Sequence, residues 1–143
     1  MTVKAILNAK GSEVATIEPT ASIAAAVKRL AERRIGALVV KGADDRVVGI
    51  VSERDIVFAL AGRGGAVLDD PVSQVMTRKV ETCEQSETLA AIMERMTAGK
   101  FRHVPVIEQG RLAGIVSIGD VVKTRIAETL REAQALKEYI AAG

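Results

Sequence analysis

Two short stretches of the chain combine a hydroxyl group and a carboxylate at the same spacing. Residues 49–55 are Gly-Ile-Val-Ser-Glu-Arg-Asp, and residues 114–120 are Gly-Ile-Val-Ser-Ile-Gly-Asp. An apolar β-branched run that ends in Ser, with Asp three residues later, predicts a strand that leads into a capped helix. Free N–H groups at a helix N-terminus favour phosphate, and an ionised Asp accepts hydrogen bonds from a ribose diol. The candidate ribose and phosphate ligands are Ser52, Asp55, Ser117 and Asp120.

A purely structural role explains the same residues. Ser at an N-cap and an acid in the first turn stabilise a helix without any ligand. That role does not explain why the whole motif occurs at equivalent places in both halves, so both interpretations stay open. Arg54 has the same two interpretations, as a solvated side chain or as a partner for phosphate oxygens beside the helix start.

The composition narrows the classes of function. Of 143 residues, 48% are hydrophobic and 27% are charged, which is typical of a soluble globular module. A net charge of +2 is too small to imply a nucleic-acid or membrane partner, and 2% aromatic residues disfavour stacking of single-stranded nucleic acid. Neither a signal peptide nor an apolar run of membrane-spanning length is present, so we expect a cytoplasmic protein.

No catalytic or metal-binding constellation is apparent. Cys83 is the only cysteine, which excludes an intrachain disulfide and a Cys-cluster metal site. The one His, His103, lies 20 positions away with no supporting motif. We therefore expect a binding module that is not an enzyme and requires no cofactor. We also expect the basic pairs at residues 33–34 and 78–79 to be solvated charges.

The elements that must position the two motifs follow from the hydrophobic pattern. In the first half we predict a helix over 2–8, a strand over 14–17, a helix capped by Thr20 or Ser22, strands over 35–40 and 47–51, and a helix from Ser52. A linker over 62–71 and a helical turn over 72–76 follow. In the second half we predict a strand over 80–83, a helix capped by Ser86 or Thr88, strands over 101–107 and 112–116, and a long helix from Ser117. The last helix carries an apolar stripe, so we expect it to pack across the module or against a partner chain.

The order of elements repeats. Val14 matches Val80 at an offset of 66, and Ser52 matches Ser117 at an offset of 65. The predicted fold class is α+β, with a duplicated β-α-β-β-α unit. We divide the chain into residues 1–65, with the N-terminal helix, and residues 66–143, with the linker and the long helix. Each half is small, so we expect the halves to share a core.

The repeated unit ending in Gly-apolar-apolar-Ser-x-x-Asp resembles the CBS domain, named after cystathionine β-synthase. Two such units resemble a CBS pair, or Bateman module, over residues 2–125. The resemblance implies a non-catalytic regulatory module that binds AMP, ADP, ATP, NAD(H) or S-adenosylmethionine in the cleft between the repeats. It also implies dimerisation through helices into a flat disc.

The resemblance implies further site residues. The motif Asp would hold the ribose, the motif Ser would contact phosphate, and two strands of each repeat would add base and phosphate contacts. These strand residues are Thr16, Ile17, Ala37, Thr82, Cys83, Arg102, His103, Val104 and Pro105. The first repeat departs from the pattern, because residues 36–40 contain neither Pro nor a cation. We therefore expect two unequal sites, with at most one of Arg102 and His103 facing a given cleft, since adjacent strand residues point to opposite faces.

The leading hypothesis is a nucleotide-sensing homodimer that acts on a regulated protein which the sequence does not identify. The second is a nucleotide-independent interaction scaffold that docks through the C-terminal helix. Binding of RNA or single-stranded DNA ranks third.

Overall fold

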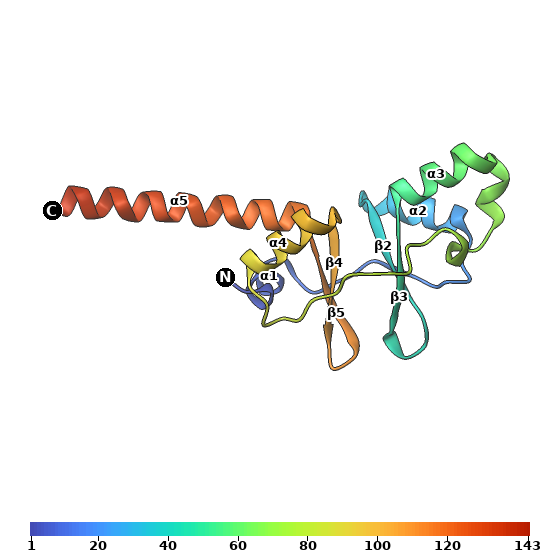
Figure 1. Cartoon of the computed structure of the whole chain (residues 1–143), viewed down its shortest axis with the longest axis horizontal. Coiled ribbons are helices and arrows are strands. Elements are labelled where there is room, and N and C mark those ends of the chain that lie inside the picture. Colours follow the sequence, from blue (N-terminus) through green and yellow to red (C-terminus); the bar gives the residue numbers. More distant parts are fainter.

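The computed structural model describes all 143 residues as two similar α+β halves and a C-terminal helix that projects from them (Figure 1). The first half contains α1 (Val3–Lys10), β1 (Thr16–Ile17), α2 (Ile23–Arg33), β2 (Ala37–Lys41), the 3-10 turn η1 (Ala43–Asp45), β3 (Val47–Ser52) and α3 (Glu53–Arg63). The second half contains α4 (Leu89–Gly99), β4 (His103–Glu108), β5 (Arg111–Ser117) and α5 (Ile118–Ala142). The 3-10 turns η2 (Gly65–Asp69) and η3 (Val72–Gln74) connect the halves.

Equivalent caps begin the equivalent helices α2 and α4. Ser22 Oγ accepts from Ala25 N at 3.1 Å, and Thr88 Oγ1 accepts from Ala91 N at 3.1 Å. Of the alternatives open in the sequence, Ser22 and Thr88 are therefore the caps. Both helices also end alike, because the C-cap residues Arg34 and Lys100 adopt the left-handed conformation with φ of 54° and 57°.

Each half contains an antiparallel hairpin, β2–β3 in the first and β4–β5 in the second. In the first half β1 pairs in parallel with β2. The predicted strand over residues 80–83 was wrong, because only Cys83 pairs with the neighbouring strand, through a bridge to Val106. In the first half Val39 N also donates to Ala15 O at 3.1 Å, but the equivalent residue of the second half is Pro105, which has no N–H to donate.

The expectation of one shared core was wrong: the chain forms two separate cores of 11 buried residues each. The halves are joined because each core contains residues from a segment that belongs to the other half of the sequence. In α1, Val3, Ile6 and Leu7 pack in the second core, while the connecting segment places Val67, Val72 and Met76 in the first. Within the predicted linker over 62–71, Val67 is therefore buried in the first core and Leu68 packs against it.

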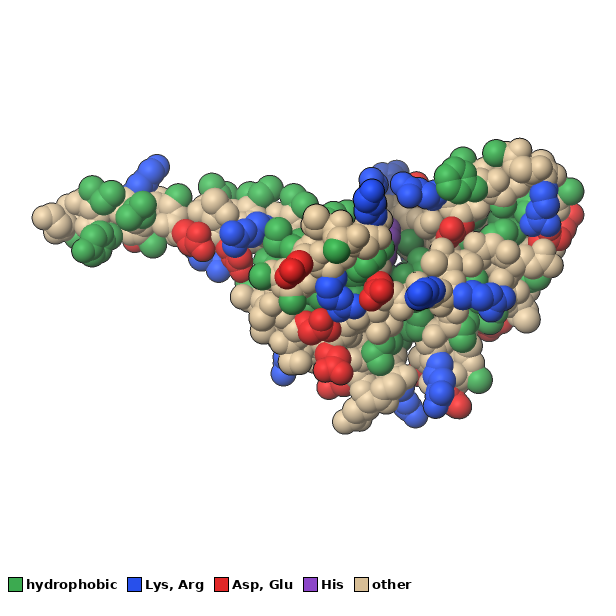
Figure 2. Space-filling view, viewed as in Figure 1, with side chains coloured by type: hydrophobic (Ala, Val, Ile, Leu, Met, Phe, Trp, Pro, Cys, Tyr) green, Lys and Arg blue, Asp and Glu red, His purple; other side chains and the backbone are tan.

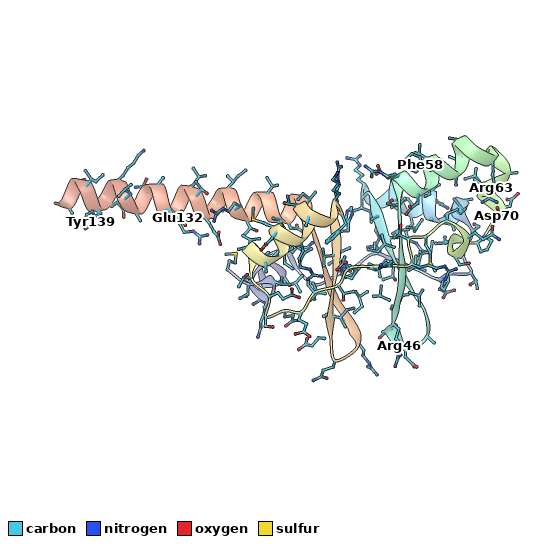
Figure 3. The ribbon with its side chains drawn as sticks, in the orientation of Figure 1. Arg46, Phe58, Arg63, Asp70, Glu132 and Tyr139 are labelled. Carbon is cyan, nitrogen blue, oxygen red and sulfur yellow. The ribbon has the colours of Figure 1, made fainter.

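The exchanged segments are held by matching backbone hydrogen bonds. Val3 N donates to Glu87 O at 2.9 Å, and Val72 N donates to Ala21 O at 2.8 Å. The reciprocal bonds run from Leu89 N to Met1 O and from Ile23 N to Asp70 O, both at 2.9 Å. The carboxylate of Asp70 also pairs with the Arg63 guanidinium at 3.0 Å, which ties the end of α3 to the same segment (Figure 3). The division of the chain at residue 65 thus stays a prediction. The segments on either side of it each pack against the core of the other half.

The glycine that opens each Ser/Asp motif makes room for the exchanged segment. A Cβ at Gly114 would lie 2.8 Å from Leu7 Cδ2, and a Cβ at Gly49 would lie 2.7 Å from Met76 Sδ. Leu7 and Met76 are 69 positions apart, as are Val3 and Val72. The pseudo-symmetry therefore extends from the repeats to the segments that cross them.

The long helix α5 leaves the module after its first turns (Figure 1). Val121 is buried in the second core, but every residue from 129 onward is exposed. Of the two placements predicted for this helix, packing across the module was therefore wrong, and packing against a partner chain stays a prediction. None of the helices has the length and apolar composition needed to cross a membrane.

Candidate functional site

Both Ser/Asp motifs close as capping boxes. Ser52 N and Oγ donate to Asp55 Oδ2 at 2.9 and 3.1 Å, and Asp55 N donates back to Ser52 Oγ at 3.3 Å. Ser117 and Asp120 form the same three bonds at 2.8, 2.9 and 3.2 Å. The structural interpretation is therefore confirmed for both copies. The capping box uses only the Oδ2 atom of the Asp. In the first copy, Asp55 Oδ1 accepts only a long hydrogen bond from Thr77 Oγ1 at 3.4 Å, so this oxygen can still accept from a ligand.

A cleft of about 530 Å³ lies beside the first motif, between the two halves. Its lining residues are Gly36, Ile50, Ser52, Glu53, Arg54, Asp55, Thr77, Lys79, Val80, Glu81, Gly99, Lys100, Phe101, Arg102 and His103. Figure 2 shows a hollow between the halves, with Lys and Arg side chains on its rim. The cleft thus combines the carboxylate of the first half with cations that come mostly from the connecting segment and the second half.

A second depression of about 720 Å³ meets the cleft at Asp55 and is more open to solvent. It lies between α3 and residues 73–78, with Phe58, Arg63 and Arg78 among its lining residues. Convergent polar groups and partial enclosure are the features of small-molecule sites. The 530 Å³ cleft has both, so it is the candidate site.

Arg102 and His103 both line this cleft, which corrects the expectation that only one could. Alternation applies within a strand, but β4 begins at His103 and Arg102 lies in the bend before it. The two residues share this cleft with Asp55, although they belong to the repeat of Asp120. The cationic groups that the first repeat lacks are therefore supplied from across the cleft.

The imidazole of His103 is half-buried among charged groups. Burial lowers the pKa of His103 below its usual range, and the nearby charges of Arg102 and Lys10 lower it further, against the opposing effects of Asp120 and Glu53. The side chain is consequently neutral at pH 7. It can gain a proton when an anion enters the cleft, because a negative charge favours the imidazolium.

The second motif is in a different state. Lys10 Nζ donates to Asp120 Oδ2 at 2.5 Å and to the carbonyl of Ile115 at 2.8 Å. Burial by itself raises the pKa of Asp120, but the hydrogen bonds from Lys10 and Ser117 outweigh it and hold this pKa below its usual range. The Asp120 carboxylate is thus already paired with a cation of the chain itself.

Lys79 is the counterpart of Lys10 in the first half. It lies 69 positions later, the same offset that relates Leu7 to Met76. Lys79 lines the cleft without forming an ion pair, whereas Lys10 is bonded to the second motif. The two copies, alike in sequence, therefore present one free and one paired arrangement.

Several predicted site residues lie outside the cleft. The side chains of Ile17, Cys83 and Val104 are buried in the two cores, and Ala37 and Pro105 are buried on the opposite faces of their strands. Thr16 and Thr82 both use their carbonyls to accept from Arg29 and Arg95, at 2.6 Å in each case. A contact from Ile17, Cys83 or Val104 to a ligand would have to come from the backbone, because these side chains are buried. Their role in binding stays a prediction.

Part of the cleft is formed by residues that were not predicted from the sequence. Lys79 was expected to be a solvated charge, and Lys100, Glu53 and Phe101 were not singled out, yet all four line the cleft. The signal that could have identified Lys79 is the 69-residue match between the N-terminal helix and the connecting segment. No sequence match identifies Lys100, because it reaches the cleft as the left-handed C-cap residue of α4.

Comparison with known proteins agrees with the repeat and the fold. The family model "CBS domain" matches residues 3–62 and 72–127. A CBS-domain-containing protein of Agrobacterium tumefaciens has a crystal structure with a TM-score of 0.84 and 52% identity, over 87% of this chain and 99% of that chain. A CBS-domain protein of Pyrobaculum aerophilum, complexed with AMP, has a TM-score of 0.73 and 30% identity, over 84% and 89%.

Another CBS domain pair, solved in complex with 5′-methylthioadenosine and S-adenosyl-L-methionine, has a TM-score of 0.80 and 27% identity, over 90% of this chain and 98% of that chain. Among curated relatives, the chain spans 71% of an Acidianus ambivalens protein that is 38% identical, but only 24% of a CBS domain-containing protein of Arabidopsis thaliana that is 35% identical. With two matched domains and one continuous pseudo-symmetric fold, the chain belongs to the CBS-domain family and consists of a tandem CBS pair.

Proposed function

We propose that the chain is a regulatory module that binds an adenosine nucleotide in the cleft at Asp55 and has no catalytic activity of its own. One observation carries this proposal. The cleft joins the available Oδ1 of Asp55 to four cationic side chains within one volume suited to a small molecule. These cationic residues are Arg54, Lys79, Lys100 and Arg102.

The cleft offers a complementary group for each part of a nucleotide. Asp55 Oδ1 would accept from the ribose hydroxyls, because Oδ2 is held in the cap. The phosphates would lie at the N-terminus of α3, where the helix dipole, Arg54 and Arg102 favour negative charge. Ile50, Val80 and Phe101 form the apolar part of the lining, against which the adenine would lie.

The charge of the cleft favours ligands that carry phosphate. Its lining includes three acids, Glu53, Asp55 and Glu81, against the four cations, so the sum is positive before His103 is protonated. AMP, ADP, ATP and NAD(H) gain from this balance, whereas the sulfonium of S-adenosylmethionine does not. The related structures with AMP and with S-adenosyl-L-methionine support the adenosine class as a whole.

Regulation would follow from where the cleft lies. Ser52 and Asp55 belong to the first half, and Arg102 and His103 belong to the second. A ligand that contacts both prefers one arrangement of the halves and so shifts the population towards it. The regulated protein would detect that arrangement in a homodimer of the module.

The test is a thermal-shift and calorimetric titration with AMP, ADP, ATP, NAD(H) and S-adenosylmethionine. A true ligand at about 100 times its dissociation constant should stabilise the fold by about 2.7 kcal/mol. Asp55→Asn keeps a cap acceptor but loses the charge, and it should weaken binding at least tenfold. Asp120→Asn is the matched control, because the same chemical change falls on the motif already paired with Lys10. If no adenosine ligand shifts the melting temperature, the proposed function is wrong.

A scaffold that acts without nucleotide is the second candidate, and the exposed apolar stripe of α5 favours it. In that case the binding of a partner protein would depend on α5 and would be the same with and without nucleotide. A pull-down with the intact chain, repeated at saturating nucleotide, separates the two functions.

A further inference from the structure

The distal part of α5 is an apolar helix without a partner in the chain. The CBS match ends at residue 127, and residues 129–142 are all exposed. The large apolar side chains of α5 beyond Val121 are 50% to 78% exposed. An isolated helix of this length is only marginally stable in water, so a helix with such a surface requires cover.

The apolar side chains of α5 follow a seven-residue repeat. Ile126, Ala133 and Ile140 recur every seven residues, as do Val122, Thr129 and Leu136. These are the a and d positions of a coiled coil, which form one narrow seam. Thr129 is the polar residue of the seam. Its hydroxyl is already paired, because Oγ1 donates to the Arg125 carbonyl at 3.0 Å.

The seam faces away from the module. The side of α5 that packs against the second half carries Val121, which is buried, and Glu128, which accepts an ion pair from the N-terminal ammonium of Met1 at 3.7 Å. At 100° per residue, Val121 and Glu128 lie about 100° and 120° around the helix from the middle of the seam. Figure 1 shows α5 extending beyond both halves, so another helix can approach the seam without meeting the module.

The charges beside the seam identify the partner. Glu132 occupies a g position and Lys137 an e position, and neither forms an ion pair within the chain. Figure 3 shows Glu132 on the same side of α5 as Tyr139, seven residues later. In a parallel pair of helices, each g residue lies opposite the e residue five positions later on the other helix. We propose that two copies of this chain pair through parallel, in-register α5 helices, with Glu132 of each facing Lys137 of the partner subunit.

An antiparallel pair fits the same seam less well. The register that places Ile126 opposite Leu136 of the partner subunit brings Glu132 towards Glu132 of the partner subunit. It also brings Lys123 towards Lys137 of the partner subunit. Like charges beside a coiled-coil seam oppose pairing, whereas the parallel register makes the Glu–Lys contact twice by symmetry.

Disulfide trapping in the intact chain tests the proposal. Leu136→Cys places a thiol in the seam, where parallel pairing brings the two copies together, while Arg131→Cys places an equally exposed thiol on the outer side of the same helix. The native Cys83 is buried, and burial is the main cause that raises its pKa to about 11. This thiol therefore contributes little to the background rate of disulfide formation. We expect Leu136→Cys to form a covalent dimer at least tenfold faster than Arg131→Cys. Equal rates would overturn the proposal.

Charge reversal in the Leu136→Cys background tests the orientation. Glu132→Lys alone and Lys137→Glu alone should each slow the crosslink by about threefold to tenfold, because each replaces two attractive contacts with repulsive ones. The double reversal should restore the original rate. If the double reversal crosslinks no faster than the single variants, the parallel pairing is wrong. The readout is independent of nucleotide and of other contacts between modules, so its failure leaves the proposed function untouched.

Discussion

Lys10 Nζ lies 2.5 Å from Asp120 Oδ2, although 110 positions separate the two residues. The N-terminal helix thus places a cation on the motif of the second half. Asp55, the equivalent carboxylate of the first half, has no such partner and faces an open cleft. Two motifs that the sequence presents as equivalent differ because one of them is already neutralised within the chain.

The first prediction is that one nucleotide binds per chain and that Lys10→Met allows a second to bind. The substitution keeps the length and apolar stem of the side chain but frees the Asp120 carboxylate for ribose hydroxyls. Isothermal titration calorimetry gives the stoichiometry. Lys4→Met is the matched control, because Lys4 is an exposed residue of the same helix whose side chain forms no ion pair. A stoichiometry of one for Lys10→Met would mean that Lys10 does not close the second site.

The second prediction concerns acid stability. The pKa of Asp120 is lowered in the folded chain, because the hydrogen bonds from Lys10 and Ser117 outweigh the burial that raises it. The folded state therefore binds this proton less readily, so the stabilisation is present above about pH 4, the usual carboxyl range, and is lost as the pH falls through the lowered pKa.

Lys10→Met should therefore reduce the free energy of unfolding by about 1 kcal/mol at pH 7 and by much less near pH 3. Urea denaturation at both pH values, with Lys4→Met beside it, measures the difference. If the free energies of unfolding of Lys10→Met and the native chain differ as much at pH 3 as at pH 7, the loss of packing, and not of the ion pair, is responsible.

The third prediction concerns the pH dependence of binding. His103 is neutral at pH 7, because burial, together with Arg102 and Lys10, lowers its pKa. A bound phosphate group favours the imidazolium, so binding is coupled to proton uptake and should tighten as the pH falls from neutral into the acid range. A ligand-induced rise of one unit in the pKa of His103 corresponds to about a tenfold gain in affinity.

The affinity should be measured between pH 7.5 and 5.5 for the native chain and for His103→Gln. The ligand itself takes up a proton in this range, and His103→Gln reports that contribution alone. If the two proteins show the same slope, His103 does not face the bound phosphate.

The fourth prediction concerns the glycine of the second motif. In Gly114→Ala the new Cβ would lie 2.8 Å from Leu7 Cδ2, so α1 must shift or the side chain must leave its rotamer. Overpacking of this kind typically costs about 1–3 kcal/mol. Gly62→Ala is the control, because a Cβ there meets nothing within 4 Å and Gly62 lies inside α3, where Ala is favoured by about 0.5–1 kcal/mol.

Thermal denaturation of the two variants should therefore show opposite signs. A Gly114→Ala chain as stable as the native one would mean that α1 is free to move away from β5. In that case the contact between Lys10 and Asp120 would also be weaker than the structure shows.

The local structure was determined largely by the sequence. The caps at Ser52 and Ser117 and the two hairpins follow from short-range patterns of Ser, Asp, Gly and β-branched residues. The duplication was equally visible, because equivalent helices and strands need the same residues at the same spacing. The strand predicted over residues 80–83 was the exception, since Pro105 has no N–H to donate where the equivalent Val39 bonds to the carbonyl of Ala15.

The tertiary structure alone decided which half each segment joins and which motif is free. The exchange of α1 and the connecting segment depends on hydrogen bonds between residues 47 to 88 positions apart, and no local pattern specifies such contacts. That exchange leaves Lys79 in the cleft at Asp55 but places Lys10 against Asp120. The sequence by itself thus determined two equivalent capped helices with potential for binding nucleotide. The departure at residues 36–40 predicted that the two sites differ, but only the packing decided which carboxylate is free, because the charge at each carboxylate is set by the segment that crosses it.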